Sequence, residues 1–169
     1  VLSLTARAMF ARSATAQLEA SSASVATAID ERLAQDVSQL KVWSSLPVMQ
    51  DVLVADSGGE IGRALESMMA HTGDFISLTA TDSRGKVIAA TSSADRGADL
   101  AGDEGFRMAA TGRVFQSTIG QRRTDEPPSI RFSVPILASY DGQSVIGTIA
   151  AVIDLKILAR SIWTRSPLS

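Results

Sequence analysis

Few residues in this sequence have the type and spacing that catalysis requires. Ser38 and Lys41 are spaced like a serine–lysine nucleophile pair, but no companion motif accompanies them. The stretch SGGEIG, residues 57–62, contains three glycines but lacks the lysine and the spacing of a phosphate-binding loop. Ser57 and Glu60 within it have the spacing of a capping box, which predicts the start of a helix. The single histidine, His71, follows a predicted helix, where a contact with the helix C-terminus is the simpler role. We therefore predict that the chain is not an enzyme.

Metal and cofactor sites have equally little support. The chain has no cysteine and one histidine, which excludes thiolate and multi-histidine metal sites. Asp99, Asp103 and Glu104 cluster at a predicted helix start and could hold calcium, but stabilising the helix N-terminus explains them more simply. A haem or covalent flavin would need a histidine or cysteine, and residues 73–160 contain neither. We expect no metal and no cofactor.

The arginines are the strongest candidates for binding a small ligand. A guanidinium group binds a carboxylate through two parallel hydrogen bonds, and small-ligand pockets combine a few polar groups with apolar walls. Phe106 and Phe115 could supply such a wall. Five arginines fall near them, namely Arg107, Arg113, Arg122, Arg123 and Arg131. Three of the five lie in predicted loops, so Arg107 and Arg131 remain as candidates for binding an anion.

Arg131 belongs to the stretch SIRFSVPIL, residues 129–137, which alternates like a half-buried strand. One face would carry apolar packing residues: Ile130, Phe132, Val134 and Ile136. Arg131 and Ser133 would lie on the opposite face. That polar face could meet solvent, or it could line a pocket for a small anion.

Composition narrows the class of protein. Hydrophobic residues make up 45% of the 169 residues, which suits one ordinary domain with a core. The net charge of -2 lacks the basic bias of a nucleic-acid binder, so we expect no nucleic-acid partner. The longest uncharged apolar stretch, residues 144–153, is about half of the ~20 residues that a membrane-spanning helix needs. With no leading methionine, the sequence reads as a fragment excised from a longer protein.

The elements that must position these residues divide into a helical half and a strand half. Between residues 15 and 45 there is no glycine or proline, and apolar residues from Leu18 to Leu46 trace one helical face. A helix of some 30 residues would be roughly 45 Å long. It could lie on a sheet, or pair with another helix through its alanine- and serine-rich early part, and the two alternatives are compatible. Pro47 should end it.

The strand half predicts an antiparallel sheet. Five strands are expected within residues 75–154, joined mostly by short turns, with one short helix near residue 106 and a closing helix after Asp154. Helices followed by such strands indicate the α+β class.

The order of these patterns resembles the Cache sensor domains, which have a PAS-like fold. The long helix and its proline break are similar, as are the FISLTATDSRGKVIAATS hairpin, the "DL" before an aromatic-bearing helix, the "SVPI" strand and the closing "DLKIL". The resemblance implies a PAS-like antiparallel sheet of about five strands, with the long N-terminal helix packed on one face. One set of strands implies a single Cache unit.

The resemblance also implies a place in a receptor. Such domains lie outside the membrane of bacterial signalling receptors, between two spans that are absent from this sequence. We expect a periplasmic or extracellular sensor that forms a homodimer through its N-terminal helix. The implied division is a membrane-proximal segment at residues 1–16, a sensor domain at 17–160 and a membrane-proximal tail at 161–169. Within the sensor domain, residues 17–72 form the helical part and 73–160 the sheet part.

The ligand is the least determined part of the resemblance. Amino-acid-binding relatives carry a Tyr, Arg, Trp, Tyr set around the pocket helix, and this helix has Phe106 and Arg107 without the Trp–Tyr pair. Asp154 matches a ligand-binding aspartate on the last strand, although it could instead cap the closing helix. We predict a small carboxylate ligand, with the ligand-binding set Phe106, Arg107, Phe115, Ser117, Arg131, Ser133 and Asp154. The alternative is a ligand-free dimerisation or protein-contact module, with Arg131 exposed to solvent.

Overall fold

A five-stranded antiparallel sheet lies at the centre of the molecule. The structure, a computed structural model, describes residues 4–73, 75–120 and 127–165, with side-chain surroundings from residue 23 to residue 160 within those ranges. The strand order is β2-β1-β5-β4-β3. The strands are β1 Phe75–Asp82, β2 Val87–Ala90, β3 Phe115–Gln116, β4 Ser129–Leu137 and β5 Val145–Asp154. The last strand in the chain, β5, therefore pairs with the first strand, β1, at the middle of the sheet.

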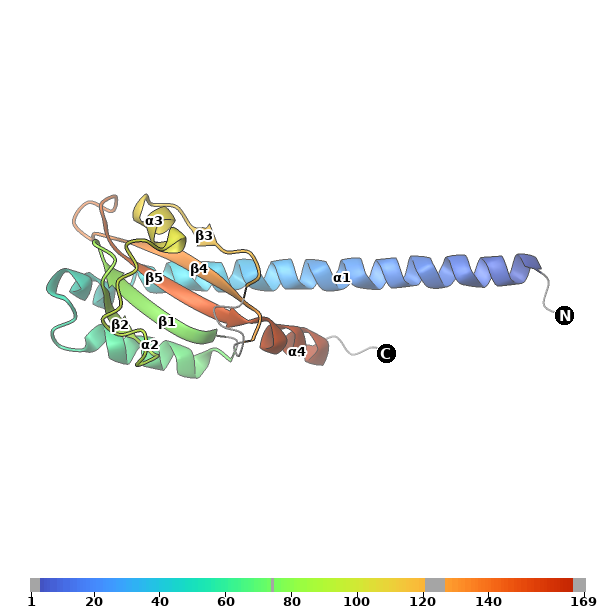
Figure 1. Cartoon of the computed structure of the whole chain (residues 1–169), viewed down its shortest axis with the longest axis horizontal. Helices are drawn as coiled ribbons and strands as arrows, with labels where there is room; N and C mark the ends of the chain where they lie inside the picture. The colour runs from blue at the N-terminus through green and yellow to red at the C-terminus, as the bar shows by residue number, and fades with distance from the viewer. Residues whose placement is uncertain (1–3, 74, 121–126, 166–169) are drawn as a thin grey trace.

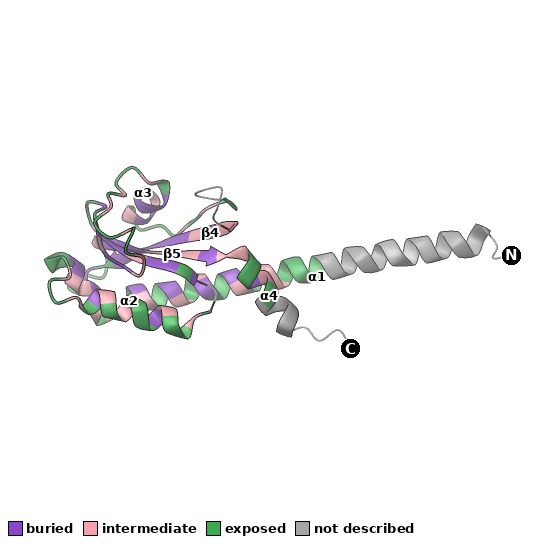
Figure 2. Ribbon diagram, turned by 60° about the horizontal axis from the view of Figure 1, so that its bottom comes forward, coloured by how far each residue is buried: buried purple, intermediate pink, exposed green. Residues whose placement is uncertain are grey.

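Helices cover both faces of the sheet. They are α1 Leu4–Ser44, the 3-10 helix η1 Pro47–Val54, α2 Glu60–His71, α3 Glu104–Ala110 and α4 Leu155–Arg165. Figure 2 shows α1 and α2 on one side of the sheet and α3 on the other. This arrangement confirms the predicted α+β class, the five strands and the long N-terminal helix packed on one face.

Helix α1 is longer than the sequence pattern predicted. It comprises 41 residues, which corresponds to roughly 60 Å at 1.5 Å per residue. No glycine or proline precedes Pro47, so nothing in the chemistry of the first residues stops the helix. Its N-terminal part projects well beyond the sheet, and α4 leaves the sheet on the same side (Figure 1). Within the described ranges, no helix combines the length and the apolar character that crossing a membrane requires.

The predicted domain boundaries do not coincide with breaks in structure. The boundary after residue 16 falls inside α1, and the boundary after residue 160 falls inside α4. The described residues on either side of each boundary therefore belong to one continuous helix. The division into three segments stays a prediction.

The core lies between the sheet and the helices α1 and α2. Leu40 of α1, Leu65 of α2 and Phe132 of β4 are all buried in one hydrophobic cluster. Trp43 packs edge-to-face on Phe75, with ring centroids 5.7 Å apart. Burial of each such side chain contributes roughly 1.5–3 kcal/mol. The apolar face predicted for SIRFSVPIL belongs to this core, because its four alternating apolar residues are all buried there.

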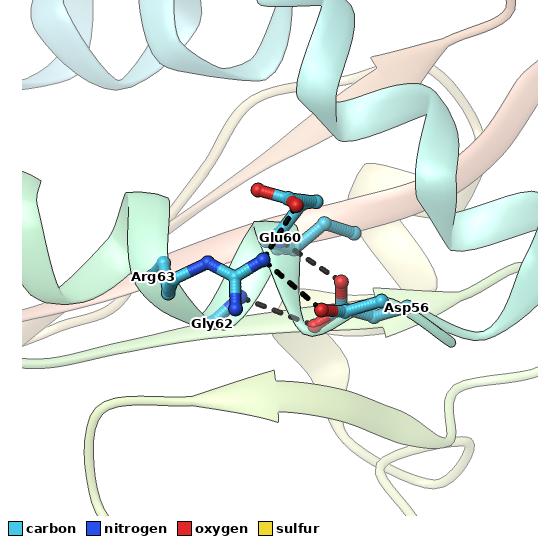
Figure 3. A network of polar contacts seen from close by, with 6 residues as sticks. Asp56, Glu60, Gly62 and Arg63 are labelled. Carbon is cyan, nitrogen blue, oxygen red and sulfur yellow. Dashed lines mark hydrogen bonds and ion pairs between the residues drawn. The ribbon is translucent and has the colours of Figure 1, made fainter.

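The start of α2 differs from the predicted pattern. The sequence suggested a capping box between Ser57 and Glu60, but the helix begins at Glu60 with no side-chain cap from Gly59. Asp56 has a left-handed backbone, with a φ of 49°. Its carboxylate accepts hydrogen bonds from the backbone N–H groups of Ile61 at 2.9 Å and Gly62 at 3.1 Å (Figure 3). The capping-box prediction was therefore wrong, because an earlier residue already satisfies the free donors of the helix.

Candidate ligand-binding site

A cavity lies on the face of the sheet opposite α1 and α2. Its volume is about 60 Å³, which is room for roughly four water molecules. The sheet forms its floor, and α3 with the segment between β2 and α3 forms its roof. Its lining consists of Ser77, Thr79, Val87, Asp95, Ala98, Leu100, Asp103, Phe106, Arg131, Ser133, Thr148, Ala150 and Val152.

Small side chains on the floor leave this space open. Ser77 and Thr79 of β1 and Ala150 of β5 occupy alternate positions that point away from the core. Thr148 is buried beside them and shares a 2.8 Å hydrogen bond with Thr81 of β1. Short hydroxyl-bearing residues at these positions provide hydrogen-bonding groups without filling the volume.

Arg131 and Asp103 form an ion pair at the wall of the cavity. The Nη1 atom of Arg131 donates to Oδ2 of Asp103 at 2.6 Å. Their side chains are 23% and 27% exposed, so water screens the pair only in part. The other carboxylate oxygen, Oδ1, accepts a hydrogen bond from the backbone N–H of Phe106 at 3.1 Å and caps α3. Asp103 therefore links β4 to the start of α3.

The close approach of α3 to β4 depends on Gly105. A Cβ atom at this position would lie 2.8 Å from Oγ of Ser133 and 3.0 Å from Oδ1 of Asp103. Such contacts are shorter than van der Waals packing allows. Glycine thus lets the roof of the cavity sit directly over Ser133, which is 2% exposed.

A wider groove adjoins the cavity and shares the ion pair in its lining. It measures about 280 Å³ and is lined by residues that include Phe115, Ser117, Asp103 and Arg131. The hydroxyl of Ser117 accepts from the backbone N–H of Arg131 at 2.9 Å and donates to the carbonyl of Thr118 at 2.8 Å. Ser117 therefore positions the backbone of Arg131, and both residues of the ion pair line both spaces.

The structure brings together five of the seven residues predicted as ligand contacts. Phe106, Arg131 and Ser133 line the cavity, while Phe115 and Ser117 line the groove with Arg131. The polar face of SIRFSVPIL, with Arg131 and Ser133, therefore lines a pocket and does not face open solvent. The role of these residues as ligand contacts stays a prediction.

Arg107 and Asp154 lie elsewhere. Arg107 is exposed on α3 and lines neither space. Asp154 accepts hydrogen bonds from the backbone N–H groups of Lys156 at 2.7 Å and Ile157 at 3.4 Å. Its carboxylate is therefore engaged at the start of α4, which agrees with the cap that was the alternative interpretation.

Sequence reasoning missed the floor of the cavity and the partner of Arg131. Ser77, Thr79 and Thr148 sit at alternate positions of strongly apolar strands, and this polarity could have indicated a lined face. The pairing of Asp103 with Arg131 had no local signal, because 28 positions separate them. Of the described lining residues, Asp95, Asp103 and Arg131 are charged, which gives the lining one guanidinium and two carboxylates.

The weaker chemical candidates have structural roles. The Ser38 hydroxyl donates to the carbonyl of Ala34 within α1 at 2.8 Å, and neither Ser38 nor Lys41 lines the cavity. Nδ1 of His71 lies 2.7 Å from the carbonyl oxygen of Ser67, near the end of α2. In the described part of the chain, no three acidic or histidine side chains are grouped as a metal site would need. Arg122 and Arg123 lie outside the described residues.

Several solved structures with the same fold are sensor or ligand-binding domains of receptors. The sensor domain of the Vibrio cholerae histidine kinase DctB superposes with a TM-score of 0.73 at 15% identity, over 87% of this chain. The Escherichia coli DcuS sensor domain superposes with a TM-score of 0.64 at 16% identity, over 80% of this chain. The ligand-binding domain of the Pseudomonas aeruginosa chemoreceptor PctC, solved with GABA, superposes with a TM-score of 0.63 at 17% identity, over 84% of this chain.

These neighbours confirm the expected fold. They are Cache-type sensor domains with a PAS-like fold, as the sequence resemblance implied. The matched region spans 58% of the DctB structure and 62% of the PctC structure, but 98% of the DcuS structure. No family model matches the sequence, and no curated protein matches it.

Proposed function

We propose that this chain is the extracytoplasmic sensor domain of a bacterial membrane signalling receptor and that it binds a small solute in the cavity beneath α3. Our best candidate for the solute is a small carboxylate. The chain itself carries no catalytic activity in this proposal, and the conversion of the signal belongs to another part of the receptor. The sensor domains that share its fold support this assignment, including one solved with GABA.

The observation that carries the proposal is the position of Arg131. Its side chain lines a small cavity whose other polar groups are the hydroxyls of Ser77, Thr79, Ser133 and Thr148 and the carboxylates of Asp95 and Asp103. A carboxylate prefers such a fork of donors among short hydroxyls. A purely structural module would require Arg131 in solvent and no enclosed space, whereas its side chain is 23% exposed at a cavity wall.

The topology provides a direct connection from the cavity to the helices that leave the body. Ala150 and Val152 of β5 line the cavity, and β5 continues without a loop into α4. Helix α1 contacts both β4 and α4. A ligand with different affinities for two arrangements of β5 would shift the positions of α1 and α4, through a coupling of typically ~1–3 kcal/mol.

Thermal unfolding with a panel of organic acids at constant ionic strength tests the function. A ligand at about 100 times its Kd stabilises the folded state by ~2.7 kcal/mol, which raises the melting temperature by several degrees. We expect at least one small carboxylate to do so and Arg131→Ala to abolish the shift. The matched control is Arg107→Ala, which removes an exposed arginine of α3. This variant should retain the ligand-induced shift in melting temperature. An absence of any shift across the panel would count against the function.

We further propose that the receptor is a homodimer paired through the projecting part of α1. The described buried residues of α1 begin at Leu33, whereas residues 23–27 are exposed. The chain has no cysteine, so a single introduced cysteine is an unambiguous probe. We expect Val25→Cys to form a disulfide-linked dimer under mild oxidation, because identical α1 helices would lie side by side. Leu53→Cys, on η1 and 59% exposed, should stay monomeric; equal cross-linking of both variants would argue against this interface.

A further inference from the structure

The arginine of the proposed site already has a carboxylate partner within its own chain. Nη1 of Arg131 and Oδ2 of Asp103 are 2.6 Å apart, a distance typical of a charge-assisted hydrogen bond. Asp103 lines both the cavity and the adjoining groove, as Arg131 does. The carboxylate of Asp103 therefore accepts from an N–H group of Arg131 that a bound carboxylate would also use.

We propose that Asp103 is an internal competitor at the site, which a ligand carboxylate must displace from Arg131 in order to bind. This inference rests on the proposed function and identifies the residue that sets its affinity. Two carboxylates cannot both make the full set of contacts with one guanidinium, and their like charges repel at short range.

Asp103 can exchange partners without losing its place in the fold. Its Oδ1 atom caps α3 through the N–H of Phe106, while only Oδ2 contacts Arg131. The two oxygens thus have separate partners, and the cap can hold the residue near the site when Oδ2 is displaced. Release of Oδ2 would remove a tie between β4 and the first turn of α3. Ligand binding on the sheet would then change how tightly the roof is held.

Substitution of Asp103 by asparagine separates the two roles. Asparagine is as good an N-cap as aspartate, so Asp103→Asn keeps the acceptor for Phe106 but removes the charge that competes for Arg131. The matched control is Glu104→Gln, which removes the neighbouring exposed negative charge without touching the ion pair. Asp103→Glu keeps the charge and should remain as weak as the unmodified chain.

The experiment is isothermal titration of the whole chain with sodium acetate, butyrate and succinate at constant ionic strength, with sodium chloride as the blank. We expect Asp103→Asn to bind the best of these acids about tenfold more tightly than the unmodified chain. Glu104→Gln should change the affinity less than twofold. A structural defect alone would weaken binding, so a gain of affinity is specific to the proposed competition. Should Asp103→Asn fail to fold, Asp103→Ser serves in its place, since serine also caps helices.

Two results would overturn the competitor role while leaving the function intact. One is equal binding by the unmodified chain and Asp103→Asn, with loss of binding only in Arg131→Ala. The other is an equal gain from Glu104→Gln, which would reduce the effect to general electrostatics. If no variant binds any of the acids, the competitor role and the carboxylate function both fail. Tight binding in Asp103→Asn with weak or undetectable binding in the unmodified chain supports the inference.

Discussion

Asp56 and Asp103 place carboxylates where an external anion could otherwise bind. Asp56 accepts from N–H groups in the first turn of α2, those of Ile61 and Gly62, which belong to the glycine-rich stretch at residues 57–62. Asp103 accepts from Arg131 and from the first turn of α3. The glycine-rich stretch therefore needs no phosphate ligand to explain it, and the arginine does not stand as an open anion site.

The contact between Gly105 and Ser133 leads to a prediction at the scale of single residues. Gly105→Ala would place a methyl group 2.8 Å from Oγ of Ser133. We expect it to push α3 from β4, to cost about 1–3 kcal/mol of unfolding free energy and to weaken ligand binding. The measurement is urea denaturation together with the ligand-induced thermal shift.

Gly102 provides the control for that substitution. A Cβ atom at Gly102 would meet nothing within 4 Å, so Gly102→Ala should be close to neutral. Alanine is the better helix former by about 1 kcal/mol, so a simple propensity effect would make Gly105→Ala more stable. That outcome would refute the argument from close packing.

The β4–β5 hairpin is organised by its turn, residues 138–144. The backbone N–H of Ala138 donates to the carbonyl of Ser144 at 2.8 Å, and the N–H of Gly142 donates to the carbonyl of Ala138 at 2.8 Å. Asp141 accepts from the N–H groups of Gln143 at 2.9 Å and Ser144 at 3.0 Å, and from the Ser144 hydroxyl. The turn sets the register of the two strands that carry Arg131 and the floor of the cavity.

These hydrogen bonds predict a pH dependence for the hairpin. The Ser144 hydroxyl, and then the backbone N–H groups of Gln143 and Ser144, lower the pKa of Asp141 below its ordinary value of 3.8. A lowered pKa in the folded state means that the contribution to stability is present above pH 3.8 and is lost as the pH falls through the lowered pKa. NMR titration of the Asp141 side chain should show that low pKa.

Asp141→Asn is the variant that isolates this effect. The asparagine cannot titrate, so the variant should lack the part of the acid destabilisation that protonation of Asp141 causes. The free energies of unfolding of the variant and the unmodified chain should therefore differ less at low pH than at pH 7. Ser144→Ala should raise the pKa of Asp141 toward its ordinary value, because the hydroxyl is the largest cause of the shift. An unchanged titration in Ser144→Ala would contradict that assignment.

At the scale of the whole molecule, α4 joins the central strand β5 to α1. Leu158 of α4 is 1% exposed and belongs to the core beneath the sheet. Helices α1 and α4 are in contact and leave the body on the same side (Figure 1). A change at the cavity can therefore reach both projecting helices through packed side chains.

Leu158→Ala tests how firmly α4 is held to the body. We expect a loss of about 2–5 kcal/mol in the free energy of unfolding, as for other buried leucines. Ile157→Ala, at a position that is 37% exposed, should cost much less. Urea denaturation measures both, and equal costs would mean that α4 is not anchored through Leu158. The ligand-induced shift should persist in Leu158→Ala, because Leu158 does not line the cavity.

Local periodicity was sufficient to predict the elements and their buried faces. The helical face through Ile29, Leu33 and Leu40 and the apolar face of SIRFSVPIL both follow from side chains a few positions apart. The assignment of Arg131 and Ser133 to the opposite face was confirmed for the same reason, since alternation along a strand is a local property. The number of strands and the α+β class followed from these elements and their short turns.

Contacts between distant segments were decided by the tertiary structure alone. The sequence identified Arg131 but could not show that Asp103 pairs with it, or that Arg107 points away from the cavity while Ser77 and Thr148 form its floor. Those facts depend on the order β2-β1-β5-β4-β3, which brings β1 and β5 together from opposite ends of the sheet half. They depend also on Gly105, which lets α3 approach β4. Sequence periodicity determined which face each residue takes, and long-range packing determined which residues meet there, because a strand's partners are set by the whole core and not by its neighbours in the chain.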